Sequence, residues 1–238
     1  MFQGFSEETF EFLSGIRENN NKEWFEKHKN IYTEKVQTPL RELSEEIFKP
    51  FESTGMIYKA GRIYRDANFP PFLHYRDILW IYIRYDALYW NKTPSLFFEI
   101  SPEGAEYGFS ISKPDAAVME FFRNDLTKNS ADFLDIIKKI KRKNIKVSGD
   151  EYKRPKPCTV PEAKEFFMKK CLSASVKIPK DKISGNISLP KDIVRIFKAV
   201  SPLNEYFHNI VQTVENKKAN PVIEEENTVK APVDEFMW

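Results

Sequence analysis

Apolar residues recur at helical spacing across residues 5–55 of the chain. Phe10, Leu13 and Ile16 are three residues apart, as expected for one face of a helix. Asn20 is interpreted as the N-cap of a second helix, because a short polar side chain can accept a hydrogen bond from the first turn. The first quarter of the chain is therefore predicted to be helical.

Between residues 60 and 112 the apolar period shortens to two, which is typical of β-strands. The segments "RIYRD", "LWIYIRY", "SLFFEIS" and "EYGFSIS" are short, rich in aromatic and β-branched residues, and separated by turn residues. Their alternation predicts one apolar face and one face that mixes aromatic and charged groups. The apolar set is Leu79, Ile81, Ile83, Leu96, Phe98 and Ile100, and the mixed set is Trp80, Tyr82, Arg84, Phe97 and Glu99.

Helical spacing returns over residues 114–216, with one late strand expected in "SASVKIP". The segments "KDIVRIFKAV" and "LNEYFHNIVQTV" are predicted as two separate helices. Residues 217–238 are polar and aperiodic, which indicates a loosely held tail. We therefore expect a single α+β domain over residues 1–216, with a mainly antiparallel β-sheet packed against N-terminal and C-terminal α-helices.

Charge and cysteine content narrow the classes of function. Thirty-seven Lys and Arg residues stand against 35 Asp and Glu, so net charge gives no general argument for a polyanionic partner. The two cysteines, Cys158 and Cys171, lie in no CxxC pattern. The start of the chain has no secretory pattern, and no apolar run approaches the roughly 20 residues of a membrane span. We expect a cytoplasmic protein with reduced thiols and no membrane partner.

Standard catalytic signatures are missing from the sequence. It contains no P-loop, GxGxxG, GxSxG or HExxH pattern, so no cofactor is expected. His28, His74 and His208 are widely spaced, and no metal site is predicted from them.

The best candidate for a polar site is "AGRIYRDANFPPFLHYRD", residues 60–77. If Arg65 were buried beside Ile63, it would need a carboxylate or another acceptor, because an unpaired buried charge is very costly. Guanidinium groups also capture carboxylates and phosphates in bidentate fashion. The alternative is that the arginines pair with the protein's own carboxylates and only hold the sheet to its helices. The candidate ligand-binding residues are Arg62, Arg65, Asp66, Arg76, Asp77 and Glu99.

A second basic feature begins at "KKIKRKNIK" and continues a few residues later. Such a patch can bind nucleic acid, but a solvated helix end is the favoured interpretation, because cations suit the negative end of the helix dipole. Aromatic residues are not interleaved with these cations, which argues against single-strand binding. The cations are Lys138, Lys139, Lys141, Arg142, Lys143, Lys146, Lys153, Arg154 and Lys156.

Several segments together resemble the bacterial domain-of-unknown-function family 2461. The N-terminal signature is "GFSEETFEFLSGIRENNNKEWFEKHKNIY", followed by "RIYRDANF", "YRDILWIYIR", "LFFEISPEGAEYGF", "GDEYKRP" and "SPLNEYF". The resemblance implies a single domain and no particular activity. Where the family pattern continues with a basic residue, Phe, Ser and an Asp-Lys pair, this chain has "NFPPFLH" before Tyr75. If those groups serve a family reaction, this chain is an inactive or altered branch.

Three functions follow as expectations. The first is a protein that binds a small anionic ligand through the arginine-rich part of the sheet. The second is an enzyme acting on a phosphate-containing or nucleic-acid substrate, with Arg62, Arg65 and Asp66 near the chemistry. The third is a binding or scaffold protein that uses the basic helix end and the terminal tail.

Overall fold

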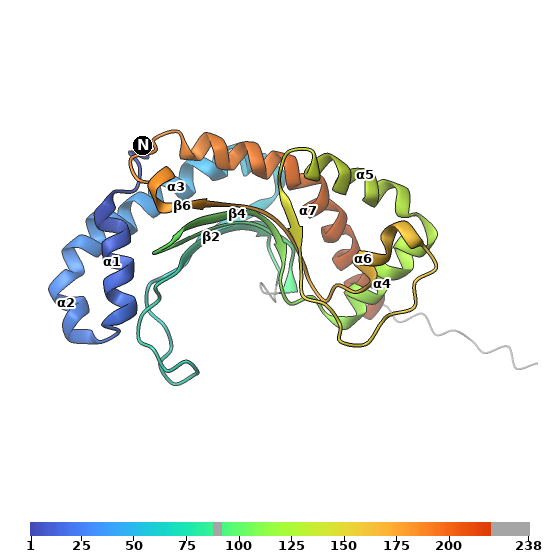
Figure 1. The fold of residues 1–238 in the computed structure, drawn as a ribbon, viewed down its shortest axis with the longest axis horizontal. Coiled ribbons are helices and arrows are strands. Elements are labelled where there is room, and N and C mark those ends of the chain that lie inside the picture. Colours follow the sequence, from blue (N-terminus) through green and yellow to red (C-terminus); the bar gives the residue numbers. More distant parts are fainter. Residues whose placement is uncertain (88–91, 220–238) are drawn as a thin grey trace, which may run out of the picture.

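The computed structural model describes residues 1–87 and 92–219 (Figure 1). In this part of the chain, six strands form one antiparallel sheet in the order β1-β2-β3-β4-β6-β5. Together with the helices, this sheet confirms the expected α+β class. The strands are β1 (Met56–Ala60), β2 (Leu79–Tyr85), β3 (Ser95–Ser101), β4 (Gly104–Ile111), β5 (Lys146–Ser148) and β6 (Leu172–Pro179).

Helices precede, interrupt and follow the sheet along the chain. A π-helical segment, Tyr32–Gln37, joins the second and third helices, and a 3-10 turn, Lys49–Thr54, leads into β1. Shorter 3-10 turns cover Pro161–Ala163 and Lys180–Lys182. The α-helices are α1 (Glu7–Glu18), α2 (Lys22–Ile31), α3 (Thr38–Phe48), α4 (Ala116–Lys128), α5 (Ser130–Lys141), α6 (Lys164–Phe167) and α7 (Leu189–Ala219).

One face of the sheet is covered and the other is open. Helix α3 packs on β1 and β2, and α7 packs on β3, β4 and β6, while α1 and α2 lie at one end and α4 to α6 at the other (Figure 1). The apolar set predicted from alternation points under these helices: Leu79, Ile83, Leu96, Phe98 and Ile100 are fully buried. The strands curve so that the second face is concave and carries no helix (Figure 1).

The long helix α7 was expected as two helices. Pro202 lies within it and cannot donate the hydrogen bond to the carbonyl of Lys198. Figure 1 shows the helix bending along its course, as a proline allows. Val200, Leu203 and Phe207 on either side are fully buried. Their burial keeps both halves on the core, so packing outweighs the lost bond.

Three further expectations differ from the structure. The expected strand over residues 62–66 is not part of the sheet, and it forms only one bridge, between Tyr64 and Tyr75. Asn21, not Asn20, caps α2, since Asn21 Oδ1 accepts a hydrogen bond from the Trp24 amide at 2.9 Å. The late strand in "SASVKIP" is β6, and the short strand β5 comes from the range expected to be helical.

Candidate functional site

The open face of the sheet holds two glutamates directly opposite each other. Glu99 on β3 and Glu106 on β4 are register partners. The Tyr82 hydroxyl donates to Glu99 Oε1 at 2.9 Å. Ser175 Oγ donates to Glu106 Oε1 at 2.6 Å, and Lys177 Nζ lies 3.1 Å from Glu106 Oε2. Each carboxyl group therefore has its own polar partner from a neighbouring strand.

Burial is the main influence on Glu99. It raises the pKa of this carboxyl above its ordinary value, the charge of Glu106 adds to the rise, and the Tyr82 hydroxyl opposes it. The same surroundings raise the pKa of Tyr82. A depression of about 230 Å³ lies over these groups and also reaches Ser95 and Ser110. A proton donor with a raised pKa thus faces a small polar hollow.

Arg84 ends the polar side of β2. The residue is 9% exposed, and its Nη1 atom is buried with no hydrogen-bond partner among the described residues. Burial lowers the pKa of this guanidinium, and Asp86 partly opposes the shift. A buried, incompletely paired cation is costly, so Arg84 joins Glu99 and Tyr82 as a group on this face whose surroundings disfavour its charged form.

The connection between β1 and β2, residues 61–78, projects away from the sheet on its open side (Figure 1). We call it the arginine ribbon. It begins where the Gly61 amide donates to the Trp80 carbonyl at 2.7 Å. A Cβ atom on Gly61 would lie 2.6 Å from a Trp80 ring atom, so only glycine fits there. Further out, the Arg65 amide donates to the His74 carbonyl at 2.8 Å.

The N-terminal helices hold the arginine ribbon in place. Asn20 forms two hydrogen bonds with the Tyr75 backbone, donating to the carbonyl and accepting from the amide, each at 3.0 Å. The Phe25 ring of α2 stacks on the Tyr75 ring with centroids 4.4 Å apart, and its edge meets Tyr64 at 5.7 Å. Asn20 thus positions the ribbon and does not cap α2, and its Nδ2 atom also donates to the Ile16 carbonyl of α1 at 3.2 Å.

Alternation along the arginine ribbon separates its side chains into two sets. Tyr64 and Tyr75 are bridge partners and face α2, as their contacts with Phe25 show. By alternation, the next residue along each arm of the ribbon, Arg65 or Arg76, lies on the side opposite Tyr64 and Tyr75, away from Phe25. They are diagonal neighbours across the ribbon.

The guanidinium groups of Arg65 and Arg76 are close enough for the charge of one to affect the pKa of the other. Burial lowers the pKa of Arg76, and the charge of Arg65 lowers it further. Both residues are half-buried. Within residues 1–87 and 92–219, no carboxylate lies within 4 Å of either guanidinium. The pair is thus two like charges without an internal counter-ion.

The other predicted site residues lie elsewhere. Asp77 pairs with Arg17 of α1 at 2.5 Å, and Arg17 also pairs with Glu103 in the β3–β4 turn. Asp66 Oδ1 accepts two hydrogen bonds from Asn68 in the exposed tip of the ribbon. Arg62 is exposed and, by alternation, shares the Tyr64 side. Among the predicted residues of the ribbon, only Arg65 and Arg76 lie on the side away from α2, while Glu99 lies on the open face of the sheet.

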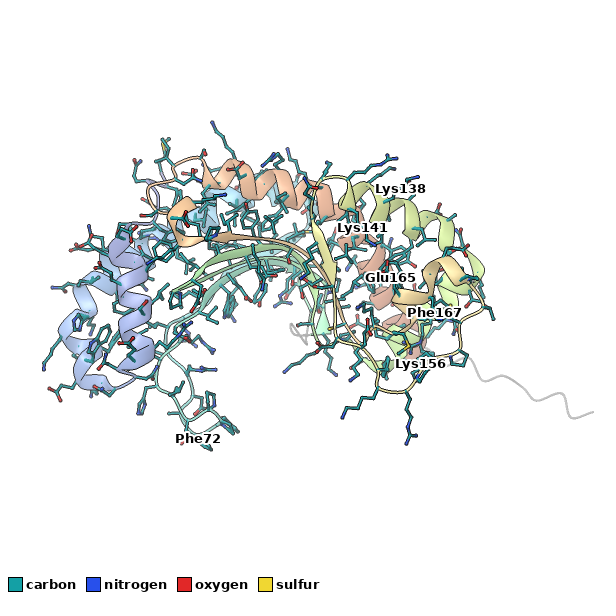
Figure 2. All side chains as sticks on the ribbon, in the orientation of Figure 1. Phe72, Lys138, Lys141, Lys156, Glu165 and Phe167 are labelled. Atoms are coloured by element: carbon teal, nitrogen blue, oxygen red, sulfur yellow. The ribbon has the colours of Figure 1, made fainter. Side chains whose placement is uncertain are left out.

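The second basic feature is divided in space. Lys139 pairs with Asp135 and Lys141 with Glu165 at the end of α5. Figure 2 shows Lys138 and Lys141 on the helical side of the molecule and Lys156 at its opposite edge. The cations from α5 and those after β5 therefore form no single patch.

Sequence reasoning missed Glu106, Ser175 and Asn20. The first two are found by extending the same alternation into β4 and β6, since Glu106 shares a face with Glu99 only once the register between the strands is known. The hydrogen bonds of Asn20 join residues 55 positions apart, and no local pattern predicts them.

The described residues provide neither a cluster of metal ligands nor a membrane-spanning helix. In the part of the chain that the structure describes, no three His, Cys, Asp or Glu side chains gather as a metal site. Nor does any helix of the described ranges have the length and apolar character needed to cross a membrane.

Comparison with known proteins agrees with the resemblance noted above. A family model for conserved hypothetical proteins, DUF2461, matches residues 8–206. The chain belongs to this family. The DUF2461 match includes the arginine ribbon, the glutamates of the open face and the helices that support both. No curated protein gives a significant match.

Proposed function

We propose that the protein binds a small phosphate-containing ligand at Arg65 and Arg76, beside the open face of the sheet. The observation that carries this proposal is the half-buried pair of like charges, with no carboxylate of the described residues within 4 Å of either. A phosphate placed between two guanidinium groups would accept charge-assisted hydrogen bonds from both and would remove their repulsion.

The site is built in advance of any ligand. Asn20 and Phe25 fix the far side of the arginine ribbon, so the arginine side is held at the edge of the sheet. A depression of about 470 Å³ begins at Ile78, two residues after Arg76, and extends over Glu99 and Glu106.

A thermal-shift panel tests the proposal. Inorganic phosphate, pyrophosphate and mononucleotides are expected to raise the melting temperature of the wild type, and Arg65→Ala or Arg76→Ala is expected to abolish the rise. Arg41→Ala is the matched control, since Arg41 is exposed on α3, away from the arginine ribbon. If no compound shifts the wild type, or if Arg41→Ala loses the shift equally, the proposal is wrong.

A second candidate function is catalysis on a phosphate-containing substrate. It rests on the carboxyl pair of the open face, where Glu99 has a raised pKa and Glu106 is paired with Lys177. Groups whose surroundings differ in this way suit a proton donor and a proton acceptor. In this second proposal the chemistry would take place at Glu99 and Glu106 rather than at Asp66.

Turnover of bis-p-nitrophenyl phosphate tests this second candidate. Wild type is expected to release nitrophenol, and Glu99→Gln is expected to bind the ester yet release it at least about 100-fold more slowly, the usual contribution of a general acid. Ser112→Ala is the control, because Ser112 lies at the margin of the smaller depression, of about 230 Å³, that covers Glu99 and Glu106. If the wild type does not hydrolyse the ester, the proposal of catalysis is wrong and the proposal of ligand binding remains.

A further inference from the structure

A second group of cations lies across the molecule from the arginine ribbon. It surrounds Tyr152, in the segment that follows β5, and Figure 2 shows Lys156 of this segment at the opposite end from Phe72 of the ribbon. The segment is tied down at Tyr152, whose amide donates to the Met168 carbonyl at 2.8 Å, and next to it, where the Lys170 amide donates to the Asp150 carbonyl at 2.7 Å.

Three cations from separate parts of the chain meet at the Tyr152 ring. Lys156 Nζ lies 4.7 Å from the ring centroid, Arg123 Cζ from α4 lies 5.5 Å away, and Lys170 Nζ lies 5.6 Å away. Each contact is a cation–π interaction, which is worth roughly 0.5–1 kcal/mol at an exposed site. Such contacts position the cations around one ring but do not neutralise their mutual repulsion.

Two carboxylates that neighbour Tyr152 and Arg123 along the chain are engaged elsewhere. Glu151 pairs with Lys169 at 2.7 Å, and Asp125 accepts the Tyr206 hydroxyl at 2.5 Å. Across residues 1–87 and 92–219, none of the three cations has a carboxylate within 4 Å. The Nη1 atom of Arg123 is buried and has no hydrogen-bond partner in the same ranges. A buried donor without an acceptor is costly, so the Arg123 guanidinium is incompletely satisfied by the described residues.

We infer that Arg123, Lys156 and Lys170 form a binding site for a phosphoryl group, separate from Arg65 and Arg76. A phosphoryl group has several acceptor oxygens and enough negative charge to pair with the Arg123 guanidinium and the two lysines together. The Tyr152 ring serves as the platform that keeps the three cations together. The inference does not depend on the proposed function of the arginine ribbon, because the two sites share no residue.

Tyrosine NMR separates this site from the arginine ribbon. The chain has ten tyrosines, and ring resonances of ¹³C-labelled protein are assigned with Tyr152→Phe, Tyr64→Phe and Tyr75→Phe. Inorganic phosphate is expected to shift the Tyr152 signals saturably, while sodium chloride at matched ionic strength does not. Saturable shifts confined to Tyr64 and Tyr75 would overturn the present inference and support phosphate binding at the arginine ribbon alone. Shifts confined to Tyr152 would support the present inference and contradict phosphate binding at the arginine ribbon.

Matched lysine variants test whether the geometry or the charge alone matters. Lys156→Ala is expected to weaken phosphate binding at Tyr152 by about tenfold or more, as for loss of a charged hydrogen bond. Lys156→Arg is expected to restore it. Lys153→Ala removes the same charge from the same exposed segment without a ring contact and is expected to change binding less than about twofold. Equal losses in the two alanine variants would overturn the inference.

The source of the phosphoryl group is distinguished by two further titrations. If the natural ligand is a small phosphate ester, a mononucleotide should bind at the Tyr152 site at least as tightly as inorganic phosphate. Its affinity should then depend on salt concentration only as expected for a single phosphate contact. A nucleic-acid backbone predicts tighter binding of a short oligothymidylate, with a slope of log affinity against log salt of roughly −0.7 per phosphate contact. If neither ligand shifts the Tyr152 signals, the inference is wrong.

Discussion

The two faces of the sheet belong to the same strands and differ in what they bury. The face under α3 and α7 buries only apolar side chains from β2 and β3, whereas the open face holds Glu99 opposite Glu106 and leaves Arg84 incompletely paired. Like charges directly opposite on a sheet are destabilising. The covered face is therefore explained by folding alone. The open face is not, and its polar groups are where we expect function.

Loss of packing on the covered face should have the largest effect on stability. Phe109 of β4 is fully buried and contacts Phe207 of α7. Phe109→Ala should cost about 3–5 kcal/mol in urea unfolding. Ser110→Ala, the next residue on the open face, should change stability by less than about 0.5 kcal/mol. Similar losses for both variants would contradict the division between the faces.

Removing the support of the arginine ribbon should have an intermediate effect. Asn20→Ala breaks both hydrogen bonds to Tyr75 and should cost about 1–3 kcal/mol, because it leaves buried backbone groups unpaired. It should also weaken phosphate binding although Arg65 and Arg76 remain. Asn19→Ala removes only one bond, to the Gly15 carbonyl, and serves as the control. Unchanged binding in Asn20→Ala would show that the ribbon needs no such support.

The pH dependence of stability should differ in sign between two glutamates. Burial raises the pKa of Glu99, so its carboxylate form destabilises the fold, and this cost grows as the pH rises through the folded pKa. Glu99→Gln should therefore melt higher than wild type at pH 8, with a difference that shrinks below pH 4.5, its ordinary value. A constant difference across this range would contradict the role of burial.

Glu103 should show the opposite trend. The Arg17 guanidinium holds the pKa of Glu103 at about 2, so this ion pair stabilises the fold above pH 4.5 and is lost as the pH falls toward 2. Glu103→Gln should melt lower than wild type at pH 8, and the difference should narrow at acidic pH. Because both groups are exposed to solvent, the expected change is small.

The smallest effect is expected for the arginine ribbon in the absence of ligand. Arg76→Gln relieves the repulsion from Arg65 and breaks no internal ion pair. Its melting temperature without phosphate should equal or exceed that of the wild type. A clear loss of stability would instead favour the alternative that Arg76 locks the fold.

Sequence patterns predicted the sheet better than the site. Period-two alternation assigned Leu79, Ile81 and Ile83 to one face and Tyr82 and Arg84 to the other, because a side chain's face depends only on its position in the strand. Which charged groups meet depends on register and on long-range contacts. Thus Asp77 pairs with Arg17, 60 residues away, rather than with its neighbour Arg76. The arginine-rich segment was identified, but the partners of its carboxylates were not.

The central claim is that Arg65 and Arg76, which have no counter-ion within residues 1–87 and 92–219, hold a phosphate. Calorimetric titration of pyrophosphate into wild type, Arg65→Ala and Arg41→Ala tests it most directly. We predict saturable binding to the wild type and to Arg41→Ala, weakened by at least about tenfold in Arg65→Ala, as for loss of a charge-assisted hydrogen bond. Equal affinity in all three proteins, or no binding to the wild type, would contradict the claim.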